Sequence, residues 1–229
     1  MMSSLEAIRP AKSACRFCEY LKSAGDNEPI NTPWLLNNEF GALISIGALV
    51  PGWTLVCPVN HQINMSNQYE KDAFWEIASK VHEVLRQAYG EIRIFEHGAQ
   101  FDQSATGCGA NHAHLHFVPL DFSLATEAMA FDEALKWEPC LLSEIEIHTS
   151  GREYLFVADH FNENKTPGFL SLLNVETSQF FRKVIAHRLG KPEFYDYRKY
   201  SMLDIGGASL KHLRLIVASD VKNGTRIAA

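Results

Sequence analysis

Three histidines alternate with apolar residues in the stretch Asn111-His112-Ala113-His114-Leu115-His116-Phe117-Val118-Pro119. Successive side chains on a β-strand point to opposite faces, so an expected strand over residues 112–119 would place the three imidazoles on one face, about 6.6–7 Å apart between neighbours. The apolar residues between them would point the other way, into a core. The pattern therefore predicts a strand with an apolar back and a chemically active front.

Three explanations of this pattern are open. The histidines can be a chance arrangement on the surface, although the chain has only ten histidines among 229 residues. Two histidines two positions apart on a strand can also share a zinc ion. Finally, a neutral imidazole is a nucleophile near pH 7, and a neighbouring imidazole can supply or hold the proton that a leaving group needs. The third explanation predicts nucleophilic catalysis at phosphorus.

A glycine-rich loop, Thr106-Gly107-Cys108-Gly109-Ala110-Asn111, directly precedes the histidines. Glycines allow successive backbone N–H groups to converge on an anion, and such an arrangement suits phosphate oxygens. We therefore take Gly107, Cys108, Gly109 and Asn111 as candidates for phosphate contact. The alternative is an ordinary turn into the strand.

The pair Cys15-Arg16-Phe17-Cys18 has the C-x-x-C spacing. By itself the spacing is compatible with a metal site, a redox pair or an accident. A redox pair of the thioredoxin type would lie between a strand and a helix, and no convincing strand precedes it. The other cysteines, Cys57, Cys108 and Cys140, are scattered, so the remaining ligands of a four-coordinate zinc site would be histidines.

Hydropathy periodicity predicts the elements that must position these residues. Apolar runs at 40–46 and 53–59 flank Pro51-Gly52, which favours a β-hairpin, and a 3.6-residue period predicts a helix over 70–89. A strand is expected at 91–96 and a loop at 97–111. In the second half we expect helices at 126–137 and 177–189 and a strand at 154–158, while the apolar run 210–218 fits a strand or a helix equally well. The order of elements predicts an α+β fold with an antiparallel sheet.

Composition excludes several classes of protein. The net charge of −6 argues against broad binding of nucleic-acid backbones. No run reaches about 18 apolar residues, so no membrane span is expected, and the N-terminal residues lack the apolar segment of a signal peptide. Five cysteines form an odd and sparse set, which favours reduced thiols and a cytoplasmic location.

The histidine pattern, His-x-His-x-His followed by two apolar residues, resembles the signature of the histidine-triad (HIT) family. The run Val50-Pro51-Gly52-Trp53-Thr54-Leu55-Val56-Cys57-Pro58, followed by His61, looks like the family's Pro-Gly-His-Thr-Leu-Val strand with its downstream histidine. The helix, the strand ending Phe95-Glu96-His97-Gly98 and the glycine-rich loop fall in family order, and the resemblance covers roughly residues 15–120. It implies a HIT-like antiparallel sheet with packed helices. Residues 1–14 would be a leader, 15–125 a catalytic domain and 126–229 a C-terminal α+β extension packed on it.

The resemblance also implies an activity. The middle histidine, His114, would attack the α-phosphorus of a nucleotide conjugate, such as a phosphoramidate or a dinucleoside polyphosphate. Water would then release the nucleotide from a covalent nucleotidyl-histidine. Family branches that transfer the nucleotide usually carry Gln at the third position of the triad, so His116 favours hydrolysis. His112 would be the first member of the triad. A nucleotidyltransferase or phosphorylase on the same scaffold, or a non-catalytic nucleotide- or zinc-binding protein, are the alternatives.

The sequence departs from the family pattern at three positions. Ser45 stands about where small members carry the acidic residue that holds the ribose, Glu96 stands where Asn is usual, and Gly109 replaces a phosphate-binding Ser. Glu96 and His97 are therefore candidates for a replacement substrate contact. The alternative is a strand end exposed to water.

Zinc-bearing relatives in the family use two cysteines, an upstream histidine and the first triad histidine. On this chain the resemblance carries these roles to Cys15, Cys18, His61 and His112 and implies a structural zinc ion. Residues 179–190 and the stretch Tyr195-Asp196-Tyr197-Arg198 resemble the C-terminal extension of longer HIT-like proteins. Arg182, Lys183 and Arg198 would then reach distal phosphates, unless they form a solvated helix face with aromatic packing. Small members are commonly homodimers, whereas an extension can instead complete the fold within one chain.

Overall fold

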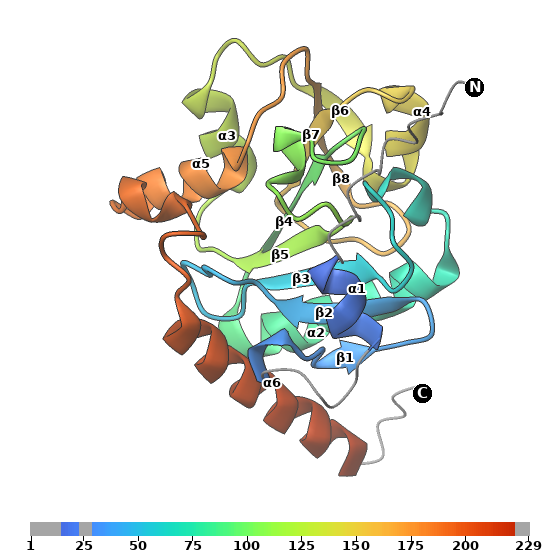
Figure 1. The fold of residues 1–229 in the computed structure, drawn as a ribbon, viewed down its shortest axis with the longest axis vertical. Coiled ribbons are helices and arrows are strands. Elements are labelled where there is room, and N and C mark those ends of the chain that lie inside the picture. Colours follow the sequence, from blue (N-terminus) through green and yellow to red (C-terminus); the bar gives the residue numbers. More distant parts are fainter. Residues whose placement is uncertain (1–14, 23–28, 223–229) are drawn as a thin grey trace, which may run out of the picture.

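The computed structural model describes residues 15–22 and 29–222, so the expected leader at 1–14 lies outside the described residues. Eight strands form one sheet in the order β1-β2-β3-β5-β4-β7-β8-β6, and every neighbouring pair is antiparallel (Figure 1). The expected α+β class with an antiparallel sheet is confirmed.

The strands are β1 Leu35–Leu36, β2 Phe40–Ile44, β3 Thr54–Pro58, β4 Ile92–Gly98, β5 Leu115–Pro119, β6 Glu138–Leu141, β7 Tyr154–Ala158 and β8 Pro167–Leu172. The α-helices are α1 Arg16–Lys22, α2 Asp72–Tyr89, α3 Leu124–Phe131, α4 Ile145–Thr149, α5 Phe180–Arg188 and α6 Leu203–Lys222.

Helices cover both faces of the sheet. On one face α2 and α6 pack against alternate strand residues such as Ile94, Leu115 and Phe117, and together they form one apolar core. On the other face α1, α3 and α5 pack against the intervening residues, such as Phe95 and Val118, in a second core. Because the period of a strand is two, His116 and His97 belong to the second face. The site is therefore built between the sheet and the layer of α1, α3 and α5.

The hairpin and the long helix form as the periodicity predicts. Strands β2 and β3 pair with Ile44 opposite Thr54, and α2 buries the apolar residues that recur every three or four positions. Gly52 turns the chain between the strands with φ of +80°, and a side chain there would collide with Tyr89 of α2. The hairpin is thus held against the end of α2.

The histidine segment differs from the expected strand. Strand β5 begins at Leu115, so only His116 of the three histidines lies on it. Before that point the backbone leaves the ladder: the amide of Ala113 donates to the carbonyl of Gln62, and Nδ1 of His114 bonds the carbonyl of His112. The backbone groups before Leu115 therefore find partners outside the β3 and β4 ladders. The expectation that the apolar residues between the histidines point into a core is confirmed, since Ala113, Leu115 and Phe117 all lie in the first core.

Strands of the second half extend the same sheet. Strand β7 pairs with β4, and β8 and β6 continue outward from it. The helix expected at 126–137 is α3, which ends at Phe131, and the ambiguous run 210–218 is part of helix α6. A domain boundary at residue 125 stays a prediction. Helix α5 confirms the helix expected at 177–189.

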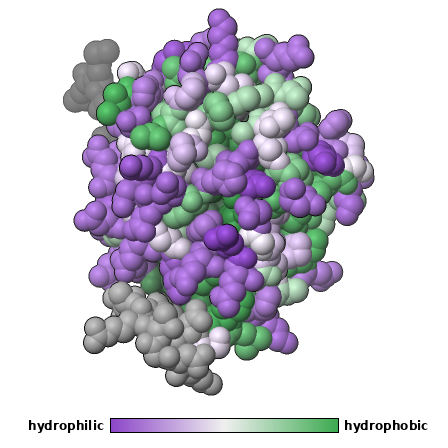
Figure 2. Space-filling model, turned by 180° about the vertical axis from the view of Figure 1, so that it is seen from behind, coloured by the Kyte–Doolittle hydropathy of each residue, from purple (hydrophilic) through white to green (hydrophobic). Residues whose placement is uncertain are grey.

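Polar side chains dominate the face shown in Figure 2, and apolar ones show between them. None of the helices in the described part of the chain is both long enough and apolar enough to cross a bilayer.

Candidate functional site

A cavity lies in front of β2, β3, β4 and β5, on the face of the sheet that α1 and α5 cover. The space it encloses, open solvent included, is about 610 Å³. His97, His114 and His116 all line it. The other lining residues are Arg16, Phe17, Tyr20, Ile30, Asn31, Leu43, Ile44, Ser45, Ile46, Leu55, Cys108, Ala110, Arg182 and Tyr197.

His114 has one nitrogen engaged and one available. Its Nδ1 lies 2.7 Å from the carbonyl oxygen of His112. A carbonyl only accepts, so Nδ1 carries the proton in the neutral ring and the lone pair is on Nε2. Burial lowers the pKa of His114 below its ordinary value, although the bond to His112 acts in the opposite direction. The ring therefore presents an unprotonated nitrogen within the cavity that it lines.

His116 is held in the opposite tautomer. The indole Nε1–H of Trp53 donates to Nδ1 of His116 over 2.9 Å. Because Nδ1 accepts, the proton of the neutral ring is on Nε2. Burial lowers the pKa of His116 well below its ordinary value. The rings of His114 and His116 are 4.7 Å apart between centroids, so a lone pair and an N–H donor stand side by side in the cavity.

His97 is the third buried histidine that lines the cavity. Its Nε2 accepts a hydrogen bond from the amide of Phe181, at the start of α5, over 3.4 Å. No described residue accepts a hydrogen bond from its Nδ1. Burial, together with neighbouring basic groups, lowers the pKa of His97 to about 3. The alternative, a strand end exposed to water, is wrong, because β7 and α5 enclose it.

The structure does not bring Glu96 to the cavity. Strand alternation turns it to the opposite face, where its carboxyl group accepts from the hydroxyl of Tyr69 at 2.5 Å and from the amide of Met65 at 2.8 Å. Burial raises the pKa of Glu96 to about 7, although both hydrogen bonds act to lower it. Adjacent residues of a strand cannot face one site, so of the two candidates only His97 lines the cavity.

The glycine-rich loop forms one rim of the cavity. A 3₁₀ turn at Ala105–Gly107 ends in Cys108 and Gly109, whose φ angles are +55° and +74°. A right-handed residue followed by left-handed ones resembles the backbone of an anion-binding nest, but here the amides of Cys108 and Ala110 donate to the carbonyls of Ala105 and Gly107. Cys108 and Ala110 line the cavity, whereas the side chain of Asn111 accepts from the amide of Gln103 and ties the loop together.

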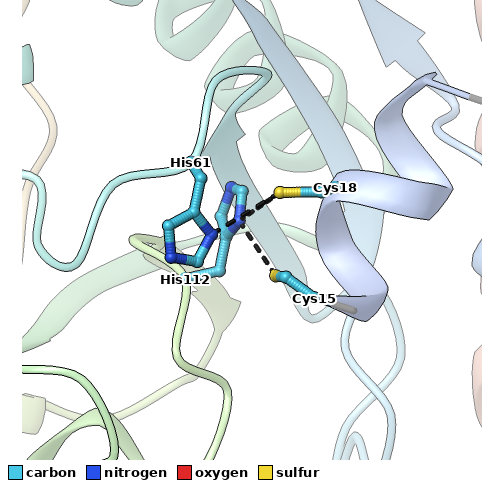
Figure 3. Close-up of side chains that lie close together, drawn as sticks. All are labelled: Cys15, Cys18, His61 and His112. Carbon is cyan, nitrogen blue, oxygen red and sulfur yellow. Dashed lines mark hydrogen bonds between the residues drawn. The ribbon is translucent and has the colours of Figure 1, made fainter. Parts of the chain in front are cut away.

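Four candidate metal ligands meet beside the cavity. Ligand atoms of Cys15, Cys18, His61 and His112 all lie within 4.8 Å of one another, so the group can hold a metal ion. Figure 3 shows the two sulfur atoms, from the start of α1, and the two imidazoles pointing towards one another. Nε2 of His112 lies 2.8 Å from the carbonyl oxygen of Pro58, which leaves Nδ1 for the cluster. Neither nitrogen of His112 is therefore free for a substrate, and His112 does not line the cavity.

Phe17 connects this cluster to the middle histidine. Phe17 lies between the two cysteines in the sequence. Its ring stacks on the rings of His112 and His114, at centroid distances of 5.6 and 5.9 Å. Sequence reasoning did not single out Phe17 or Trp53. For Trp53 a signal existed, because it stands where the family motif has its histidine, two residues after Pro51.

The basic residues of the second half divide into two groups. Arg182 is 3% exposed and lines the cavity, and Arg198 packs on Gly109 of the loop. Lys183 lies over the ring of Tyr195 and does not line the cavity. The expectation of phosphate contact thus remains open for the two arginines, whereas Lys183 matches the alternative of aromatic packing.

No family model matches the sequence, and a search of curated proteins gave no match. Two similar solved structures are a Hit-like protein involved in cell-cycle regulation from Bartonella henselae and a hypothetical histidine triad nucleotide-binding protein from Sulfolobus tokodaii strain7. The first is 20% identical, with a TM-score of 0.32, over 38% of this chain and 65% of its own, less than two thirds of that protein. The second is 14% identical, with a TM-score of 0.35, over 87% of this chain and 94% of its own. Both names agree with the family that the motifs resemble, but likeness at such TM-scores supports no conclusion about activity.

Proposed function

We propose that this chain is a histidine-triad hydrolase that cleaves nucleotide phosphate conjugates at the α-phosphorus through a covalent nucleotidyl-His114. The observation that carries the proposal is the bond from Nδ1 of His114 to the carbonyl of His112. It places the proton on the nitrogen away from the reaction and the lone pair on Nε2, in a ring that lines the cavity.

In the first step Nε2 of His114 forms a bond to the α-phosphorus, and the bond from phosphorus to the leaving group breaks. The leaving group keeps the bonding electrons; an oligophosphate departs as an anion, and a weaker leaving group takes a proton from solvent. In the second step water attacks the same phosphorus, the P–N bond breaks, and the proton of the water passes to solvent. The products are a nucleoside monophosphate and the free leaving group.

The neighbours of His114 would stabilise charge on the phosphoryl oxygens. His116 holds its Nε2–H beside the nucleophile and donates to a phosphoryl oxygen as negative charge develops there. In the glycine-rich loop the amides of Cys108 and Ala110 donate to carbonyls of the loop itself, so the backbone N–H of Gly109 is the loop's candidate for contact with the same oxygens. Donors fixed before the reaction act without the cost of reorganising solvent.

We further propose that Cys15, Cys18, His61 and His112 hold a structural zinc ion. Zinc bonds of about 2.3 Å to sulfur and 2.0–2.1 Å to nitrogen in a tetrahedron separate S and N by about 3.6 Å. Three S–N distances of the cluster, Cys15–His112, Cys18–His61 and Cys18–His112, are 3.4, 3.5 and 3.6 Å. The bond from His112 to Pro58 supplies the outer-shell partner that metal-bound histidines usually have. Bound zinc would fix α1, and with it Phe17, against the segment that carries His114.

The test is product analysis with a panel of nucleoside phosphoramidates and dinucleoside polyphosphates, with and without orthophosphate as an acceptor. His114→Ala should abolish turnover, whereas His148→Ala, an exposed histidine on α4, should leave it unchanged. Turnover that persists in His114→Ala would defeat the proposal. Turnover that requires orthophosphate would favour a phosphorylase on the same scaffold. A homodimer and a cytoplasmic location stay predictions.

A further inference from the structure

Three guanidinium groups gather around one aromatic ring at the mouth of the cavity. The Cζ atoms of Arg16, Arg182 and Arg198 lie 5.7, 5.7 and 5.6 Å from the centroid of Tyr197. They come from α1, from α5 and from the turn after the 3₁₀ helix Pro192–Tyr195. Distant parts of the sequence thus bring three like charges together, in a chain whose net charge is −6.

No carboxylate of the described residues is in contact with these charges, although Asp196, from a greater distance, opposes the lowering of the pKa of Arg182 by burial. In the part of the chain that the structure describes, no carboxylate oxygen lies within 4.0 Å of any of the three guanidinium groups. The carboxylate of the same turn, Asp196, accepts from the amide of Arg198 and lies 3.9 Å from Nζ of Lys199. Buried charges without a partner are costly and uncommon in proteins. Arg182 is 3% exposed, so neither solvent nor a contacting carboxylate of the described residues balances its charge.

A purely structural role uses only part of Arg182. Its Nε donates to the carbonyl of Tyr195 at 2.8 Å and its Nη2 donates to the carbonyl of Gly47. A guanidinium has five N–H donors, so others remain for a ligand in the cavity that the side chain lines. Two carbonyls also give no net negative charge to balance the cation.

The cluster adjoins the loop that we assign to the attacked phosphate. The hydroxyl of Tyr197 donates to the carbonyl of Cys108 at 2.9 Å, and the guanidinium of Arg198 packs on Gly109 so closely that a Cβ at that position would collide with it. Arg16, Arg182 and Tyr197 line the cavity together with His114. An anion at the cluster would therefore be a neighbour of the phosphate at His114, and not a separate ligand elsewhere.

We propose that Arg16, Arg182 and Arg198 form a second anion subsite that takes the phosphates beyond the one attacked by His114. This inference rests on the proposed function and deepens it. The preferred substrate is then a nucleotide with a chain of phosphates, in which the subsite holds the leaving oligophosphate. A nucleoside phosphoramidate, with its single phosphate, leaves the subsite without an anion. Arginine suits the task because its planar fork binds phosphate oxygens in pairs.

The experiment measures binding of inorganic tripolyphosphate and of orthophosphate to the full chain with its metal bound, by calorimetry at fixed ionic strength. Variants Arg16→Gln and Arg198→Gln remove one cation each from exposed or half-buried positions, and Lys199→Gln removes a neighbouring cation of the same turn as the matched control. We expect tripolyphosphate to bind at least tenfold more tightly than orthophosphate. Each arginine variant should weaken tripolyphosphate about tenfold, the loss of one charge-assisted contact, and Lys199→Gln should change it less than about twofold.

Equal affinity for the two anions would overturn the subsite, and so would an Arg198→Gln variant that behaves like Lys199→Gln. Metal content measured on Arg16→Gln separates loss of the cation from damage to the neighbouring cysteines. The outcome is distinct from that of the proposed function, because binding needs no turnover. Binding of tripolyphosphate that depends on the arginines, without an adduct on His114, would support the subsite and reject the hydrolase. An adduct on His114, without binding that depends on the arginines, would support the hydrolase and reject the subsite.

Discussion

The indole of Trp53 donates to Nδ1 of His116 over 2.9 Å, across 63 positions of sequence. Both side chains are buried, so solvent does not compete for the bond. Because an indole N–H only donates, the bond fixes which nitrogen of His116 carries the proton. The guanidinium of Arg182 lies 4.7 Å from the centre of the Trp53 ring. The C-terminal half of the chain thus supports the third histidine through the tryptophan.

Replacement of Trp53 should affect chemistry more than substrate binding. In Trp53→Phe the ring remains but the donor is lost, so His116 can adopt the tautomer that has no proton on Nε2. We expect kcat to fall by roughly tenfold to hundredfold, as for loss of an oriented donor, with KM changed less than about threefold. Trp75→Phe is the matched control, since it also removes a buried indole donor, to the carbonyl of Tyr69, but on the opposite face of the sheet. Equal losses of kcat in both variants would show that only folding is affected.

Phe17 should position His114 without holding the metal. Phe17→Leu removes the ring that stacks on His112 and His114 and leaves all four ligands in place. We expect adduct formation to slow by roughly threefold to tenfold while metal content stays at the wild-type level, because a stacked aromatic pair is worth about 0.5–1.5 kcal/mol. Stopped-flow turnover and elemental analysis of the same sample measure the two quantities. Metal loss in Phe17→Leu would contradict this division of roles.

The metal site should hold about one zinc ion per chain. Cys15→Ser and Cys18→Ser each remove a thiolate ligand, so each should weaken zinc binding by at least about hundredfold, more than the loss of an outer-shell partner. Chelation should lower the Tm of the wild-type chain, because bound metal stabilises the native state. Cys140→Ser, whose sulfur bonds a backbone carbonyl on the edge strand β6, is the control and should keep its zinc. Full zinc occupancy in both ligand variants would refute the assignment.

Glu96 should make stability depend on pH. Its folded-state pKa of about 7 lies above the ordinary value of 4.5, so between these values the native state binds a proton that the unfolded state has released. The stability it contributes is fully present below pH 4.5 and is lost as pH rises through 7. Glu96→Gln is neutral throughout, and its stability relative to wild type should increase between pH 5 and pH 8 by on the order of 2 kcal/mol. A difference in unfolding free energy that is flat over this range would show that burial does not raise the pKa of Glu96.

The sequence predicts elements whose pattern is local. The spacing of Phe74, Ile77, Val81 and Leu85 identifies α2, and Pro51-Gly52 between two apolar runs identifies the hairpin. The run 210–218 was ambiguous because its apolar residues do not follow the period of a helix or of a strand alone, and only its packing within α6 against α2 decides it. The start of β5 could not be placed, because it depends on the bond between Ala113 and Gln62, 51 positions earlier in the chain.

The site could also be predicted only where a local sequence pattern identifies its residues. The histidine motif identifies His114 and His116, and the four candidate ligands do meet in space. The face of the sheet to which Glu96 or His97 points depends on the register of β4. A change of register by one residue would move every side chain of the strand to the other face. The gathering of Arg16, Arg182 and Arg198 around Tyr197 joins residues more than 160 positions apart, and no local pattern encodes it.

The decisive measurement for the covalent intermediate is the intact mass of the protein, quenched by denaturation within milliseconds of mixing with a dinucleoside polyphosphate. We expect an increase equal to one nucleoside monophosphoryl group, mapped by peptide sequencing to His114 and absent from His114→Ala. Turnover of the same substrate with no adduct on any histidine, or with an adduct that survives in His114→Ala, would contradict a covalent intermediate on His114.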